Sequence, residues 1–185
     1  NTISLDQTNS SSSTTYGFYL YGYQANYRSI VQNNIVSITR GGSGTKYGLY
    51  QACGCTGTDV DISKNDIYMN AASGTNYYGY VTSFALQTNY AGWASQVTSG
   101  FSVNPSFINM TNFDYHPTST VIANQSIPYP SPNNLIYDQM NAVRNPTAPD
   151  VGALEFSQPA CIGTPTGVTL TGPNYLLCPG ENATL

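Results

Sequence analysis

The sequence predicts an all-β fold, a right-handed parallel β-helix whose solenoid coils are about 31 residues long. Two motifs recur along it in nearly fixed phase. The first is Asn, a polar residue and Ile, and it begins at the evenly spaced positions Asn1, Asn33 and Asn65. The second begins with Tyr-Gly, at the evenly spaced positions Tyr16, Tyr47 and Tyr78. Two markers that keep phase in this way indicate a chain that repeats its own structure.

The repeated elements are predicted to be strands. Apolar residues alternate with others in short runs, such as 60–62 and 67–69, and clusters of Gly, Asn and Ser separate these runs. No long stretch carries apolar residues at helical spacing, which excludes a helical repeat. In a parallel β-helix, equivalent residues of successive coils lie about 4.8 Å apart, so the repeated positions should form columns.

Each repeated position then has an expected role. The predicted columns are an inward aliphatic ladder, a turn column of hydrogen-bonded amides that tolerates left-handed backbone, a corner column that needs positive φ or close packing, and an aromatic column. The aliphatic ladder would consist of Ile3, Ile35 and Ile67, and the amide column of Asn1, Asn33 and Asn65. The corner column would consist of Gly17, Gly48 and Gly79, and the aromatic column of Tyr16, Tyr47 and Tyr78.

Composition limits the function. Only 8% of the 185 residues are charged and the net charge is −4, so the chain lacks the basic surface of a nucleic-acid binder. No run of 18 apolar residues predicts a membrane span. Because Asn1 already lies inside the first repeat, we expect a fragment of a longer polypeptide. We expect no cofactor.

Four cysteines fit an oxidising compartment. Cys161 and Cys178 flank a stretch rich in Thr, Gly and Pro, and we expect a structural disulfide between them. Cys53 and Cys55 are separated by one residue, so a strained bridge between them and pairing with a neighbouring segment both stay open. Their distance from the other cysteines gives no zinc-site spacing, and we expect no metal. Together with the low charge, the cysteines indicate an extracellular or cell-surface protein.

The region after the repeats carries a recognisable set of motifs. Residues 103–109 read VNPSFIN, residues 112–116 read NFDYH and residues 149–156 read PDVGALEF. This order and spacing resembles the C-terminal end of secreted bacterial right-handed parallel β-helix proteins of the pectate-lyase-like superfold. In that family, a "DPxFV…DYHL" segment forms the last coils and a "D-I-G-A-x-E" strand closes the helix.

The resemblance implies structural roles and also shows departures. Residues 119–125 read STVIANQ where the family has "SPAID-G", and Asn141 replaces a glycine within residues 138–144, but each change keeps a turn-forming residue. The resemblance makes five charged residues candidates for buried polar ties that close the last coil. These are Asp114, Asp138, Arg144, Asp150 and Glu155.

The chain is predicted to divide near residue 157. Residues 1–157 form the β-helix, and residues 158–185, from the Cys161 segment to the Leu176-Leu177-Cys178-Pro179 segment, resemble the first strands of an immunoglobulin-like module. Two strands are too few for a sandwich of about seven. Such modules follow β-helices in large adhesins of gliding or type IX-secreting bacteria, so the resemblance implies a secreted bacterial surface protein.

Candidate enzymatic residues lie on the predicted strands. Calcium-dependent lyases need a carboxylate cluster and a Lys or Arg base, and inverting hydrolases need paired carboxylates. The candidates are Asp59 and Asp61, with Lys64, Asp66, Lys46 and Arg28 nearby in the expected coil register. No second carboxylate pair occupies equivalent positions one coil away. We therefore interpret Asp59 as a turn residue and Asp61 as a solvated strand residue.

His116 is the only histidine, and it carries little catalytic weight. Asp114 lies too close in sequence to indicate a Ser-His-Asp triad, because geometry rather than residue inventory defines one. In the resembled motif this position joins a loop to a strand. We predict no catalytic residue in this chain.

Tyrosine supplies the binding hypothesis. The chain has 16 Tyr, and a tyrosine combines a flat apolar face with a hydroxyl group, which suits sugars and protein surfaces. The candidate ligand-binding residues are Tyr19, Tyr21 and Tyr23, which alternate along one strand, and Tyr50 and Tyr80, which should stack on Tyr19. The predicted function is adhesion or a structural filament, with a polysaccharide or neighbouring copies as partners. The alternative is a polysaccharide lyase or glycoside hydrolase with catalytic coils upstream.

Overall fold

The computed structural model describes residues 1–8, 12–21, 29–52, 60–81, 88–94, 97, 99–129 and 135–156, which are mostly β-structure. The strands in these residues are β1 (Thr2–Leu5), β2 (Thr15–Tyr21), β3 (Ser29–Gln32), β4 (Ile35–Ile38), β5 (Lys46–Ala52), β6 (Val60–Ser63), β7 (Asp66–Met69) and β8 (Asn76–Val81). A short helix α1 (Tyr90–Ala94) and a 3-10 turn η1 (Met110–Asn112) follow them.

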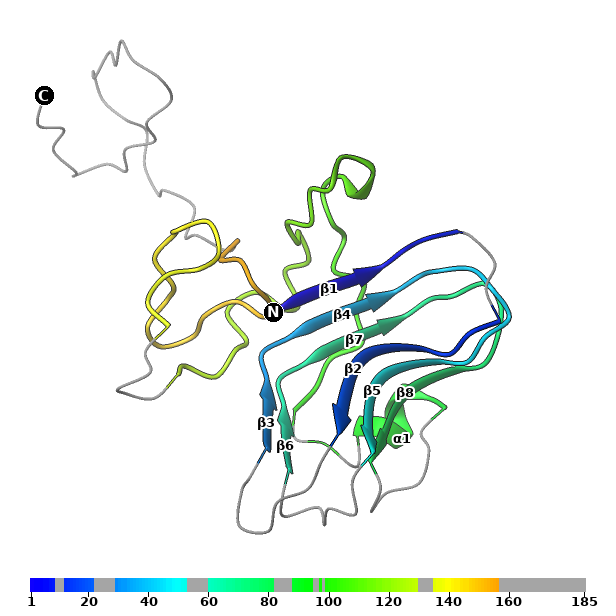
Figure 1. The fold of residues 1–185 in the computed structure, drawn as a ribbon. Coiled ribbons are helices and arrows are strands. Elements are labelled where there is room, and N and C mark those ends of the chain that lie inside the picture. The colour runs from blue at the N-terminus through cyan, green and yellow to red at the C-terminus, as the bar shows by residue number, and fades with distance from the viewer. Residues whose placement is uncertain are drawn as a thin grey trace, which may run out of the picture.

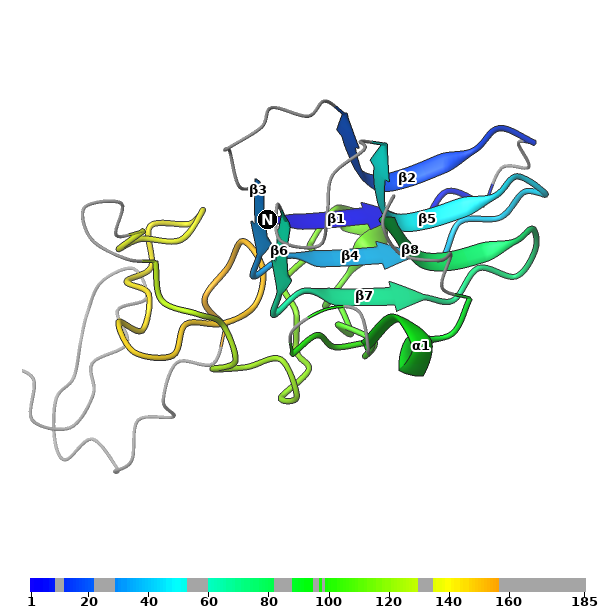
Figure 2. The same cartoon turned by 90° about the horizontal axis from the view of Figure 1, so that it is seen from below.

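The strands form parallel sheets that the chain visits in a fixed order. The sheets are β1-β4-β7, β2-β5-β8 and β3-β6, and every pairing between these strands is parallel. The chain passes from the first sheet to the second, then to the third, and returns to the first (Figure 1 and Figure 2). A parallel bridge between Asp66 and Phe101 begins a further visit to the first sheet. This is the arrangement of a parallel β-helix or solenoid.

The register corrects the predicted aliphatic ladder. Ile3 pairs with Val36, and Val36 pairs with Ile67, whereas Ile35 pairs with Thr2 and Asp66. The sequence separation from Ile3 to Val36 is larger than that from Val36 to Ile67. The evenly spaced Asn-x-Ile motif is therefore out of register in the middle coil. Since side chains alternate across a strand, Ile35 points away from the face that carries Ile67.

Strand β4, in the middle of the first sheet, is buried on both sides. On its inner side, the core consists of Val31, Leu49, Ile62 and Ile67. On its outer side, Ile35 packs against Ile122 and Val151 from the chain that follows the repeats. Residues 135–156, which we call the closing segment and which are yellow to orange in Figure 1, lie beside the start of β1. The N–H of Ala153 donates to the hydroxyl of Thr2 in β1 at 3.0 Å, and the N–H of Gly152 donates to the carbonyl of Asn33, just before β4, at 3.0 Å.

The asparagine column exists, but with a different middle member. The amide of Asn1 donates to Asn34 at 3.0 Å, and the amide of Asn34 donates to Asn65 at 2.8 Å. Asn33 lies just outside the column and adopts the expected left-handed backbone, with φ of 60°. Its side chain instead holds Ile127, donating to the carbonyl at 2.7 Å and accepting from the N–H at 2.9 Å.

The glycine column marks a close-packed bend within β2 and β5, and neither Gly17 nor Gly48 has a positive φ. A Cβ on Gly17 would collide with the carbonyl of Gly48 and the side chain of Val36, and a Cβ on Gly48 would lie 2.6 Å from the carbonyl of Tyr78. Gly79 does not continue this column, because it pairs with Leu49. The sequence separation between paired residues of β5 and β8, such as Tyr47 and Tyr77, is shorter than the Tyr-Gly spacing predicts, so the predicted register between these two strands is wrong.

Four of the five predicted polar ties form one buried network. Asp138 accepts from the N–H groups of Met140 and Ala142 at 2.7 and 2.8 Å, and its other oxygen accepts from the N–H of Glu155 at 2.8 Å. Arg144 donates to the carbonyl of Gly152 at 2.9 Å. Backbone N–H and carbonyl groups thus form hydrogen bonds with these charged side chains, and such bonds satisfy a buried carboxylate or guanidinium.

Asp150 and Glu155 complete this network, whereas Asp114 lies outside it. Asp150 accepts from the N–H of Asn124 at 2.6 Å and from that of Phe156 at 2.5 Å. A Glu155 oxygen lies 3.5 Å from the guanidinium of Arg144. Asp114 is partly exposed, so its prediction as a buried tie is wrong.

Several predictions fall outside the described residues. These are the immunoglobulin-like segment 158–185 and the residues Arg28, Tyr23, Cys53, Cys55, Asp59, Cys161 and Cys178. Asn141, which replaces a glycine of the resembled motif, has φ of 64° and so keeps the predicted turn conformation. Across the described residues, no helix is long and apolar enough to cross a membrane.

Candidate binding surface: two columns of tyrosine

The second sheet carries a column of stacked tyrosine rings on its outer side. The rings of Tyr16 and Tyr47 lie 5.5 Å apart between centroids at an interplanar angle of 9°, and Tyr47 and Tyr77 lie 5.2 Å apart at 16°. The predicted third member, Tyr78, instead makes an edge contact with Tyr90 at 5.6 Å. The shorter last step of the register explains the exchange, because it puts Tyr77 opposite Tyr47.

A second column runs beside the first. Tyr19 and Tyr50 stack at 5.4 Å and 9°, and Tyr50 and Tyr80 stack at 4.9 Å and 19°. The ring of Tyr21 continues the row from Tyr19 at 6.4 Å. The structure thus brings together Tyr19, Tyr50 and Tyr80 in the predicted column, while their role in binding stays a prediction. We call Tyr16, Tyr19, Tyr21, Tyr47, Tyr50, Tyr77 and Tyr80 the tyrosine face.

A bend in each strand joins the two columns. Residues three apart on a flat strand point to opposite sides, yet Tyr16 and Tyr19 make an edge contact at 4.8 Å. Gly17 lies between them, at the place where the paired residues skip from Tyr16 to Phe18. Figure 1 shows that β2, β5 and β8 each turn partway along their length. Edge contacts of 5.0 Å between Tyr47 and Tyr50 repeat the arrangement one coil on.

The tyrosine face is amphipathic and uncharged. Phe18 and Leu20, on the opposite side of β2, pack against the inner core, while Tyr19 and Tyr21 are 49% and 83% exposed. The only charged residue in the three strands is Lys46, which is 1% exposed. Its ammonium donates to the carbonyls of Gly42, Gly44 and Ser73 at 2.8, 3.1 and 2.7 Å.

The phenols of Tyr47 and Tyr50 remain neutral at physiological pH. Burial raises the pKa of Tyr47 above its usual value, and the neighbouring Tyr77 adds to the rise. The pKa of Tyr50 is likewise raised by burial and then by Tyr80. Each hydroxyl can therefore both donate and accept a hydrogen bond.

Sequence reasoning missed that both columns belong to one surface. It placed Tyr16 and Tyr47 in a structural column and Tyr19, Tyr50 and Tyr80 in a separate binding column. The signal is the spacing Tyr-Gly-x-Tyr in the first two coils, because a close-packed glycine between two tyrosines permits the bend.

The described enzymatic candidates are held in structural contacts. Asp66 is fully buried and one of its oxygens accepts from the N–H of Val103 at 2.9 Å. The ammonium of Lys64 lies 5.5 Å from the centre of the Phe101 ring. Asp61 is partly exposed on β6, opposite Ile30 of β3. Among the described residues, no group of three His, Cys, Asp or Glu side chains is arranged to hold a metal ion.

His116 and Asp114 form a pair beside a shallow hollow. Nδ1 of His116 lies 2.5 Å from a carboxylate oxygen of Asp114, and this hydrogen bond lowers the pKa of Asp114. The hollow, about 380 Å³ in volume, is also lined by Thr118. The hydroxyl of Thr118 donates to the carbonyl of Ser106 at 2.7 Å, so that hydroxyl is committed to the backbone.

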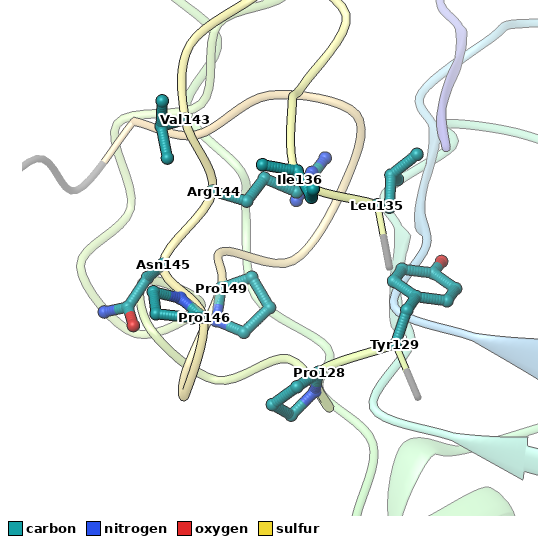
Figure 3. A pocket seen from close by; sticks show the side chains of 9 residues that line it. All are labelled: Pro128, Tyr129, Leu135, Ile136, Val143, Arg144, Asn145, Pro146 and Pro149. Carbon is teal, nitrogen blue, oxygen red and sulfur yellow. The ribbon is translucent and has the colours of Figure 1, made fainter. Parts of the chain in front are cut away.

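A second hollow of about 200 Å³ lies between residues 128–129 and the closing segment (Figure 3). Its walls are mainly proline and aliphatic side chains, with Tyr129 at one side and Asn145 at another. Arg144 also borders it, but the guanidinium is held by the backbone carbonyls of Asp150 and Gly152. The hollow therefore offers apolar contacts and little polar recognition.

Comparisons with protein-family models, with curated proteins and with solved structures found no match for this chain. The solenoid architecture therefore rests on the strand pairing described above.

Proposed function

We propose that this chain is a right-handed β-helical segment, with coils of about 31 residues, of a large secreted or cell-surface protein that acts in adhesion or as a structural filament. The observation that carries the proposal is the tyrosine face, an ordered and uncharged aromatic surface on a repetitive scaffold.

The scaffold suits a rigid spacer. In a solenoid, each coil covers the edge of its neighbour, so length is added without a separate core for each unit. Here the parallel sheets and the amides of Asn1, Asn34 and Asn65 run through successive coils. Such continuous hydrogen bonding along the stack resists bending and extension, as a stalk or filament requires.

The tyrosine face suits contact with other molecules. Tyr and similar side chains combine a large apolar area with a hydrogen-bonding tip, and few rotatable bonds limit the entropy lost on binding. Because no charge lies on this face, a ligand would be held by apolar contact and neutral hydrogen bonds. Carbohydrate binding is the more specific form of this proposal.

A test should compare the chain with two exposed-tyrosine variants. The double variant Tyr19→Thr/Tyr21→Thr keeps a good strand former at exposed positions, and Tyr137→Thr, 55% exposed in the closing segment, is the matched control. The immobilised chain would be probed with neutral and acidic polysaccharides and with coated surfaces. We expect retention that the double variant loses and the control keeps.

The same samples test whether this chain itself has lyase or hydrolase activity. Incubation with acidic polysaccharides, with and without calcium, would release unsaturated or reducing ends if the chain were a lyase or a hydrolase. We expect no release. Turnover by this chain would overturn the adhesive assignment in favour of the enzyme.

A further inference from the structure

We propose that the partner of the tyrosine face is the tyrosine face of a second copy of this chain, so that two solenoids pack laterally through their tyrosine columns. This inference rests on the proposed function, because it takes the tyrosine face as a contact surface and names what covers it.

The repeat distance of the columns favours a partner built like this chain. Ring centroids advance by 4.9 to 5.5 Å from one coil to the next. Neighbouring strands of a parallel sheet advance by about 4.7–4.9 Å, whereas one extended peptide places side chains of the same side about 6.6 Å apart. The side chains of a single bound strand would therefore fall out of register with the tyrosine rings over three coils. Another stack of coils would keep it.

The chemistry of the face also favours its own copy. A face that carried net charge would repel an identical face, but the outward residues of β2, β5 and β8 carry none. Each phenol can act as donor towards one copy and as acceptor from another. Identical aromatic side chains interdigitate well where two stacked β arrays meet, as they do in dry interfaces between paired sheets.

The exposed part of the face is where this contact would form. Within one chain, ring faces inside each column are covered by their neighbours, and the two most exposed members of the face are Tyr19 and Tyr21. These two rings lie next to each other in the C-terminal part of β2. A two-fold arrangement would place the same residues on both sides of the contact, which closes the pair.

Sedimentation velocity of the full chain over a wide range of concentrations tests the proposal. We expect reversible dimers, whose dissociation constant rises about tenfold or more in Tyr19→Thr/Tyr21→Thr, as for truncated aromatic anchors at other interfaces. The matched variant Tyr137→Thr should associate like the parent. A monomer at every concentration, or equal association of both variants, would overturn the inference.

Chemical nitration of tyrosine gives an independent readout that needs no variant. With the protein concentrated, Tyr19 and Tyr21 should be modified more slowly than in dilute solution, while Tyr137 reacts at the same rate in both. Unchanged rates at Tyr19 and Tyr21 would count against the contact. A monomer that still retains a neutral polysaccharide through these tyrosines would leave the adhesive function standing and remove the second copy as its partner.

Discussion

Asp66 should make the stability of the fold depend on pH. Its carboxyl group is fully buried at the start of β7, where the preceding coil has Ile35. One oxygen accepts from Val103, and the other has no hydrogen-bond partner in the described part of the chain. Burial raises the pKa of Asp66 from 3.8 to about 7. Substitution by Asn keeps the acceptor for Val103 and removes the ionisation.

The size and sign follow from proton linkage. Because the folded state holds the proton more tightly than the unfolded state, protonation stabilises the fold fully below pH 3.8, and this contribution is lost as the pH rises to about 7. The difference between the two pKa values corresponds to about 4 kcal/mol, at roughly 1.4 kcal/mol for each tenfold change. That is a large part of the ~5–15 kcal/mol that stabilises an average domain.

Urea unfolding followed by circular dichroism at several pH values between 4 and 8 measures this effect. The free energy of unfolding of the parent chain should fall towards neutral pH relative to that of Asp66→Asn. Parallel pH curves for the parent and Asp66→Asn would refute the assignment of a raised pKa to this buried carboxyl group.

Three further predictions concern the packing of the coils. Lys46→Met should lower the free energy of unfolding by about 2 kcal/mol, because it removes the hydrogen bonds from Lys46 to the carbonyls of Gly44 and Ser73, and thermal unfolding measures the loss. Gly48→Ala should cost about 1–3 kcal/mol, because the new Cβ meets the carbonyl of Tyr78. Gly100→Ala is the control for Gly48→Ala, since the nearest atom to a Cβ on Gly100 would be 3.4 Å away. Equal melting temperatures of the two variants would contradict the close-packing argument. Asp150→Asn should increase hydrogen exchange in residues 150–156, because an amide cannot accept from both N–H groups that the carboxylate holds; unchanged exchange would argue against that role.

The repeat was readable from sequence because it fixes which segments become neighbours. The register was less readable, since an Asn-Asn pair and a Tyr-Tyr pair each allow a slip to the adjacent position. The structure chooses Asn34 over Asn33, and Tyr77 over Tyr78, because the connections between strands differ in length from coil to coil. Such a slip reverses the side on which each side chain lies.

The outer covering of the first sheet shows a second limit. Ile35 and Val36 are adjacent and both fully buried, which is the pattern of a strand covered on two sides. The prediction of a single inward aliphatic ladder did not account for this pair of adjacent apolar residues. The buried network of Asp138, Arg144, Asp150 and Glu155 was easier to predict, because the motifs at residues 138–144 and 149–156 contain its members. The bend at Gly17 depends on close approach between coils, which alternation along one strand does not reveal.

The contact between the closing segment and the first coil has a consequence for folding. The N–H of Ala153 donates to the hydroxyl of Thr2 at 3.0 Å, so partners 151 residues apart must meet before this side of the sheet is covered. Contacts of such long sequence separation slow folding, because the loop must close before they form. Until then, the apolar surface around Ile35 is open to other chains, and newly made molecules pass through an aggregation-prone stage. Late closure would place the kinetic risk of this solenoid on the outer side of its first sheet.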